Sequence, residues 1–289
     1  MITFNSLLES DGIDLREVVV LRHRPSEPEL RKVLPWLAQN KPELYNAHQQ
    51  TQSSRCEPAI AKATYVASFI AHGSGKALFV GLFERRGSRP LSEVAYWKIR
   101  AHQELRNLGN VGFTSRRKRI LLFDLRLLPT YQEWKGRLIV NWPPPERSWW
   151  RRAHRNTFSL SAIPEESVLD RSMPPWEQIN LRWTDLDVIP ARWCDALREW
   201  RGIYFIFDES DAKGYVGSAY GAENILGRWL NYRKSGHGGN KLLRHRDPRN
   251  FRFSILQRMS PDMETTEVIR LESAWKERLH TREHGLNEN

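Results

Sequence analysis

The chain has 289 residues, of which 40% are apolar and 27% are charged, and its formal net charge at pH 7 is +11. Such a chain can bury the cores of two domains of ordinary size. It contains neither a run of about eighteen apolar residues nor a basic N-terminus followed by an apolar stretch, so we expect no membrane span and no secretory signal. The basic excess favours a polyanionic partner, because Lys and Arg release the counterions that condense on phosphates.

The first part of the chain, residues 1–163, predicts a basic domain of mixed α and β structure. Its strand patterns are apolar or alternating runs at 18–21, 77–83, 117–128 and 136–142. Its helical patterns cover 27–39, where Pro35 is expected to kink or end the helix, and 92–109, where Gly109 is expected to end it.

Basic residues and tryptophans gather in two stretches of this domain, RRKR at 116–119 and RSWWRRAH at 147–154. Residues 200–289 hold 15 Lys and Arg against 12 Asp and Glu, whereas the rest of the chain holds 30 against 22. Arg beside Trp suits stacking on unpaired or flipped bases. Tryptophans in such stretches also pack in cores and between domains, so both interpretations stay open.

The two cysteines, Cys56 and Cys194, are far apart in the sequence. They form no CxxC or Cys/His spacing of the kind that holds a metal. We therefore expect buried, free thiols in a reducing, cytoplasmic compartment.

Residues 164–190 differ in character from their surroundings, because four prolines interrupt acidic and aromatic residues. They are expected to form a linker or a docking segment. The second domain, 191–289, then predicts a leading helix at 191–200, strands at 202–208 and 214–218, a helix at 222–235, a strand at 250–256 and a long helix after Ser260 and Pro261. This order predicts a three-stranded antiparallel sheet flanked by helices, and an α+β class for the whole chain.

Five short motifs follow one another in the second domain: GIY at 202–204, YVG at 215–217, GRWLNY at 227–232, RLESAW at 270–275 and HGLN at 284–287. On these motifs the segment 202–289 resembles the GIY-YIG nuclease domain. The resemblance implies a metal-dependent endonuclease that hydrolyses DNA phosphodiester bonds. The implied site residues are Tyr204, Tyr215, Arg228, Tyr232, Glu272 and Asn287.

The chemistry of phosphodiester hydrolysis agrees with these residue types. By resemblance, Glu272 holds Mg²⁺ or Mn²⁺, which stabilises the developing charge and assists the leaving oxygen. Arg228 can clamp the scissile phosphate with its planar fork. Either Tyr204 or Tyr215 deprotonates the attacking water, and His237 contacts phosphate or assists the base.

The hairpin places Tyr204 and Tyr215, which are eleven positions apart, on neighbouring strands. We expect both side chains on the sheet face that the helices carrying Arg228 and Glu272 leave open, so that all four groups line one concave site. A slip of one residue in register would send one tyrosine to the opposite face.

A basic loop lies between the expected helix at 222–235 and the strand at 250–256 and extends into that strand. Its candidate DNA-contacting residues are Lys241, Arg244, Arg246, Arg249 and Arg252. These side chains suit phosphate contacts, which position a protein on DNA without reading sequence. A solvated basic loop is the alternative.

The resemblance also bears on the biological role. Domains of this family bind DNA weakly without an attached domain, so residues 1–163 are expected to be a DNA-targeting module. Restriction of foreign or modified DNA is the favoured role, and a structure-selective repair nuclease is the first alternative. An alternative of a different class is a non-catalytic nucleic-acid-binding protein with a degenerate nuclease fold.

Overall fold

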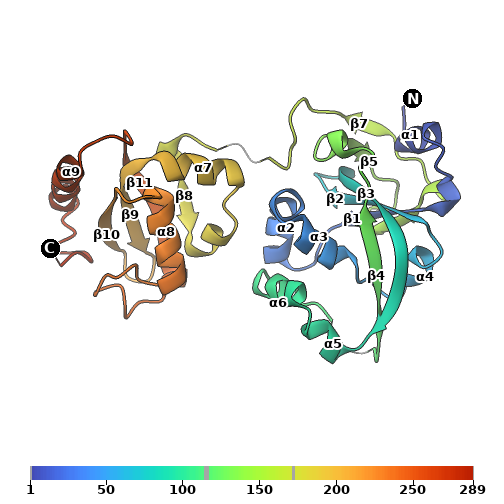
Figure 1. Cartoon of the computed structure of the whole chain (residues 1–289), viewed down its shortest axis with the longest axis horizontal. Helices are drawn as coiled ribbons and strands as arrows, with labels where there is room; N and C mark the ends of the chain where they lie inside the picture. The colour runs from blue at the N-terminus through green and yellow to red at the C-terminus, as the bar shows by residue number, and fades with distance from the viewer. Residues whose placement is uncertain (1, 114–116, 171–172, 289) are drawn as a thin grey trace. The chain divides into compact units, whose positions relative to one another are not determined.

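The computed structural model describes residues 2–113, 117–170 and 173–288 (Figure 1). The chain divides into two compact units, Met1–Asp170 and Arg171–Asn289. Most of the segment 164–190, for which the sequence left a linker and a docking segment as alternatives, belongs to the second unit. Its apolar side chains Ile179, Leu181 and Leu186 are buried in the core of the second unit.

A seven-stranded sheet forms the centre of the first unit, in the order β6-β1-β2-β3-β5-β7, with β4 paired to β3. The strands are β1 (Val18–His23), β2 (Tyr65–Ala71), β3 (Lys76–Leu91), β4 (Ile120–Leu127), β5 (Ile139–Asn141), β6 (Trp150–Arg152) and β7 (Leu160–Ala162). β1 and β2 run parallel, and the other neighbours run antiparallel. All four strand patterns expected from the sequence are confirmed. Arg116 of the RRKR stretch lies outside the described residues.

Helices cover this sheet, and two of them occupy residues 92–109, where a single helix was expected. The helices are α1 (Phe4–Ser10), α2 (Pro28–Asn40), α3 (Pro42–Gln49), α4 (Glu57–Ile60), α5 (Glu93–Trp97) and α6 (Arg100–Asn107), with short 3-10 turns at Leu15–Glu17, Gln132–Trp134 and Ala153–Arg155. Pro35 lies inside α2 and does not end it.

The single helix expected over 92–109 is broken into α5 and α6. Ile99 between them has extended backbone angles. The carbonyl oxygen of Tyr96 then lies 3.0 Å from Nδ1 of His102, so a side chain supplies the partner that a continuous helix would have supplied. The periodicity of the sequence continues across this break and does not reveal it.

The second unit is built on a four-stranded antiparallel sheet in the order β10-β9-β11-β8. Its strands are β8 (Asn180–Arg182), β9 (Arg201–Asp208), β10 (Lys213–Ala219) and β11 (Phe251–Met259). The expected three-stranded sheet therefore gains a fourth strand. β8 pairs with the free edge of β11, where Leu181 lies opposite Phe253 and both side chains are buried.

Helices flank both faces of this sheet (Figure 1). They are α7 (Ala191–Glu199), α8 (Asn224–Ser235) and α9 (Thr265–Arg278), with 3-10 turns at Trp176–Gln178, Trp183–Asp187 and Pro248–Asn250. α9 begins at Thr265, and the hydroxyl of Ser260 bonds Asp262 instead of capping the helix. The strand side chains divide accordingly, since Tyr204 and Ile206 pack with α7 and α8, whereas Ile203 and Val216 pack with α9.

The α+β class expected from the sequence is confirmed. Cys56 and Cys194 are both free, with Cys56 buried. Within the described ranges, no helix combines the length and the apolar character needed to cross a bilayer.

Candidate active site

The hairpin formed by β9 and β10 places Tyr204 and Tyr215 on the same face of the sheet. In the register of the two strands Tyr204 lies opposite Gly217, and Tyr215 lies opposite Ile206. A Cβ atom at position 217 would come within 2.3 Å of the Tyr204 hydroxyl oxygen. The Tyr204 ring therefore crosses the backbone of the neighbouring strand, which only a glycine at position 217 permits.

Three tyrosines gather on this face, because α8 adds Tyr232. Their ring centroids lie 6.0 to 6.5 Å apart. The hydroxyl oxygens of Tyr204 and Tyr232 are 3.1 Å apart and share a hydrogen bond. Arg228, one turn before Tyr232 on α8, donates from Nε and Nη2 to the Tyr204 hydroxyl at 3.4 and 3.3 Å. We name Tyr204, Tyr215, Tyr232 and Arg228 the tyrosine cluster.

Asn240 connects two of these phenols and was not found from the sequence. Its Nδ2 donates to the Tyr232 hydroxyl at 2.6 Å, and its Oδ1 accepts from the Tyr215 hydroxyl at 3.0 Å. The glycines before it position this amide, because a Cβ at Gly238 would come within 2.5 Å of the Tyr232 ring. An Asn after the glycine-rich turn GHGG was the available signal.

His237 lies in the turn between α8 and Asn240. Its Nδ1 accepts a hydrogen bond from the Gly239 amide at 3.0 Å. This contact stabilises the turn that carries Asn240. Among the contacts of the described residues, His237 makes none with the tyrosine cluster.

Burial controls the ionisation of the cluster. Removal from water raises the pKa of Tyr204, which the nearby Arg228 guanidinium opposes. Burial also raises the pKa of Tyr215, and the neighbouring Tyr204 and the Glu272 carboxylate add to this shift. The phenols are therefore protonated at neutral pH in the absence of an added cation.

Glu272 comes from α9, the helix on the opposite face of the sheet. Its Oε2 accepts a hydrogen bond from the Ser218 hydroxyl on β10, which is the edge strand, and its Oε1 lies 2.8 Å from Nζ of Lys276. Ser218 alternates with Gly217 and therefore points to the α9 face. At the β10 edge of the sheet, Glu272 lies near Tyr215 of the tyrosine cluster.

The expectation that both tyrosines emerge on an open face is therefore wrong. α8 covers the face on which they lie, and Tyr204 is completely buried. A pocket of about 320 Å³ opens instead at the β10 edge, and its lining includes Tyr215, Glu272, Lys276, Asn240 and Asn287. We name it the edge pocket. Tyr204, Arg228 and Tyr232 are absent from its lining.

Asn287 extends the sheet at this edge. Its Oδ1 accepts from the Val216 amide at 2.9 Å, and its Nδ2 donates to the Val216 carbonyl at 2.8 Å. The side chain thereby replaces a neighbouring strand for one residue of β10. Both polar ends of the amide are used in this way.

Most of the expected DNA-contacting residues have acidic partners within the protein. The pairs are Lys241 with Glu288, Arg246 with Asp208 and Asp211, Arg249 with Asp247, and Arg252 with Glu209. Arg244 is exposed, and no such partner occurs among the described residues. Arg246 is 20% exposed and holds the buried carboxylate of Asp208, so its guanidinium is used within the protein.

The edge pocket offers few protein ligands for a metal ion. Among the described residues, no group of three or more His, Cys, Asp and Glu side chains is arranged to bind one. Glu272 is 16% exposed and faces the pocket, and Glu288 also lines it. This fits a Mg²⁺ ion that keeps most of its waters and binds one carboxylate, rather than an ion enclosed by protein ligands.

No protein family matches the chain, and no curated protein matches it. A solved structure that is similar to part of it is a mutant of the catalytic domain of intron endonuclease I-TevI, with 27% sequence identity and a TM-score of 0.26. The match covers 31% of this chain and 94% of that chain.

Proposed function

We propose that the unit Arg171–Asn289 is the catalytic domain of a metal-dependent endonuclease that hydrolyses DNA phosphodiester bonds. This proposal rests on one observation: Tyr215 of the tyrosine cluster lines the same edge pocket as Glu272. A phenol can act as a general base, and a guanidinium and a carboxylate-bound metal ion can stabilise developing charge, so these groups suit hydrolysis of a phosphodiester.

Tyr215 is the better placed of the two candidate bases. Tyr215 lines the edge pocket, whereas Tyr204 is fully buried and its hydroxyl accepts hydrogen bonds from the Arg228 guanidinium. We assign Tyr215 to deprotonation of the attacking water and Tyr204 to positioning of Arg228. Asn240 accepts from the Tyr215 hydroxyl and so fixes its orientation.

The raised pKa of Tyr215 requires a nearby positive charge before this phenol can act as a base. A divalent ion bound at Glu272 would supply that charge and would stabilise the oxygens of the leaving group. Lys276, which is 12% exposed, forms an ion pair with the same carboxylate and holds Glu272 at the pocket.

The biological role we favour is restriction of foreign or modified DNA, with the unit Met1–Asp170 as the targeting module. A structure-selective repair nuclease would need the same catalytic unit and would differ in the DNA that the first unit selects. A non-catalytic binding protein is the alternative that the experiment below excludes or supports.

The test is cleavage of supercoiled plasmid in Mg²⁺ and in Mn²⁺ by the full chain and by Glu272→Gln. We expect the variant to lose at least about 100-fold in rate, because it removes a group that acts on the transition state. Glu277→Gln on the same helix is the matched control, since Glu277 is 73% exposed and lies outside the edge pocket. Its rate should stay that of the wild type.

Thermal unfolding of each variant reports whether the fold is kept. Equal rates for Glu272→Gln and the wild type would refute the assignment. A wild-type protein that binds DNA but leaves it uncut in both metals would support the non-catalytic alternative.

A further inference from the structure

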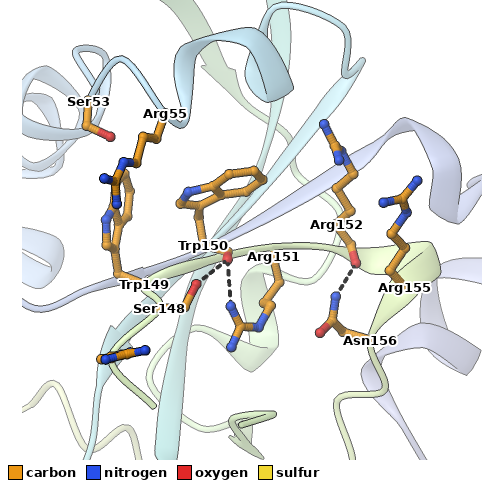
Figure 2. A pocket seen from close by; sticks show the side chains of 10 residues that line it. Ser53, Arg55, Ser148, Trp149, Trp150, Arg151, Arg152, Arg155 and Asn156 are labelled. Carbon is orange, nitrogen blue, oxygen red and sulfur yellow. Dashed lines mark hydrogen bonds between the residues drawn. The ribbon is translucent and has the colours of Figure 1, made fainter. Parts of the chain in front are cut away.

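The first unit contains a pocket of about 710 Å³ at the β6 edge of its sheet. Two sequence stretches that are far apart form it, one between α3 and α4 and one around β6 (Figure 2). Arginine and tryptophan dominate its lining, and no acidic side chain takes part. We name it the Arg/Trp pocket.

Strand alternation decides which side chains of β6 enter this pocket. β6 pairs with β1, so that Trp150 lies opposite Leu21, Arg151 opposite Val20 and Arg152 opposite Val19. Successive residues of a strand point to opposite faces. Trp150 and Arg152 therefore share one face, and the Arg152 guanidinium lies 5.8 Å from the Trp150 ring centroid.

Arg151 points away from the others and has a structural role (Figure 2). Its Nη2 donates to the carbonyl oxygens of Pro143 and Pro145 at 3.1 and 2.9 Å. Its guanidinium also lies 5.9 Å from the Trp142 ring centroid. This arginine holds the proline-rich turn before β6 and is not available to a ligand.

Three of the remaining arginines at the pocket are available, whereas Nε of Arg155 donates to Nε2 of His154 at 3.2 Å. Arg55 and Arg147 are exposed, and Arg152 is partly exposed. Within the described parts of the chain, their guanidinium groups have no carboxylate partner and donate no hydrogen bond. In the view of Figure 2, Arg55 and Trp149 lie toward one end of the pocket and Arg152 and Arg155 toward the other, with Trp150 between the two ends.

The two indoles are held in place without being covered. Trp149 and Trp150 are partly buried and pack against a cluster that includes Val19, Leu21 and Phe123. The Trp149 carbonyl oxygen accepts a hydrogen bond from the Arg22 backbone amide at 2.7 Å, and this bond fixes the backbone before β6. An aromatic ring that is positioned in advance loses little conformational entropy when a ligand stacks on it.

We propose that the Arg/Trp pocket binds an unpaired stretch of DNA, with bases on Trp149 and Trp150 and phosphates on Arg55, Arg147 and Arg152. Indole rings stack on any base, and guanidinium groups match phosphate geometry. A base that is paired in a duplex cannot present its flat face to a side chain, so the site favours single strands or extruded nucleotides. The choice of DNA rests on the proposed function.

The test uses a short fluorescein-labelled oligothymidylate, the matching duplex and the matching oligouridylate, each titrated with the full chain. EDTA is present, so that cleavage plays no part. Fluorescence anisotropy gives the dissociation constants. Two changes are compared with the wild type: the double variant Arg55→Ala with Arg147→Ala, and Trp149→Leu, which removes stacking while leaving an apolar side chain.

We expect each change to weaken binding of the oligothymidylate about tenfold, as loss of a stacking ring or of two phosphate contacts does. The matched control is Arg89→Ala with Arg106→Ala, which removes two exposed charges from the same unit. Arg106 lies 4.9 Å from the Trp97 ring centroid, so the control also breaks an arginine–tryptophan contact outside the pocket. Its affinity should stay near that of the wild type.

Unchanged affinity in the Arg55/Arg147 double variant, which alters only exposed side chains, would overturn the proposal even if Trp149→Leu failed to fold. So would a wild-type preference for the duplex. Tighter binding of the oligouridylate that the same changes abolish would assign the pocket to RNA instead. Pocket-dependent DNA binding by a protein that cleaves no DNA would remove only the proposed nuclease function.

Discussion

Two arginine-rich stretches of this chain have similar compositions, but their arginine side chains have different partners in the structure. The loop and strand start at 241–252 and the stretch at 147–155 are both dense in basic residues. In the first, Arg246, Arg249 and Arg252 are each paired with a carboxylate. In the second, Arg147 and Arg152 face a pocket with no acidic lining.

The difference shows that the number of arginines in a stretch does not predict how much positive charge the folded surface presents to a binding partner. Asp208, Asp211 and Glu209 come from the end of β9 and the hairpin turn, and only folding brings them to Arg246 and Arg252. A carboxylate within hydrogen-bonding distance satisfies the fork of the guanidinium and competes with a phosphate for it. Arg246 is therefore a structural residue, whereas Arg147 and Arg152 remain available to a ligand.

The largest effect expected from this comparison is on stability. Arg246→Ala leaves the carboxylate of Asp208, which is 1% exposed, without its ionic partner. Removing one partner of a buried pair costs about 3 kcal/mol of unfolding free energy. Arg147→Ala should leave that free energy within about 0.5 kcal/mol, as exposed substitutions do. Urea unfolding of the full chain measures both.

Equal stability of the Arg246 and Arg147 variants would contradict the structural role of the first stretch. Because Arg246 lies in the second unit and Arg147 in the first, unfolding is followed in each unit separately, by hydrogen exchange of the backbone amides of β9 and of β1 as the urea concentration rises.

A smaller effect is expected on the salt dependence of binding. Neutralising each phosphate of a single strand contributes about 0.7 to the slope of log affinity against log salt. The Arg55/Arg147 double variant should therefore reduce the slope for oligothymidylate by about 1.4. Arg249→Ala with Arg252→Ala removes two arginines that are already paired, and should reduce the slope much less. A larger loss in the second variant would reverse the comparison.

The smallest effect is on acid stability. Burial would raise the pKa of Asp208, but hydrogen bonds from Ser210 and the ion pair with Arg246 outweigh it and lower this pKa. A carboxyl whose pKa is lowered in the folded state stabilises the fold above its unfolded pKa of about 4. That contribution is lost as the pH falls through the lower, folded value.

Asp208→Asn should therefore show a weaker loss of unfolding free energy between neutral and acid pH than the wild type. Urea titrations at several pH values measure the difference. Parallel curves for the two proteins would show that the Asp208–Arg246 pair does not carry the acid sensitivity.

The second unit illustrates how much of the fold the sequence predicts. The alternating pattern around the turn at 209–213 predicts the β9–β10 hairpin, and that hairpin fixes Tyr204 and Tyr215 on one face. The helical spacing of Arg228 and Tyr232 predicts their shared face on α8, which the contact between guanidinium and ring confirms. These features depend on residues close in the sequence.

Contacts between distant segments could not be predicted in the same way. β8 is only three residues long and pairs with a strand some seventy positions later in the chain. Asn240 acquires its place from two tyrosine-bearing elements, β10 and α8. None of these residues has a local pattern that distinguishes it from a loop or surface residue.

The sequence by itself determined the hairpin, the order of the helices and strands from α7 to α9, and the residue types suited to phosphodiester chemistry. Local periodicity and turn residues encode these, because side-chain direction along a strand or helix follows from backbone geometry alone. Only the tertiary structure decided that Tyr204 is buried behind Gly217, that Tyr215 reaches the edge pocket, and which arginines are paired. Burial and ion pairing depend on what folds against each side chain, and that partner comes from elsewhere in the chain.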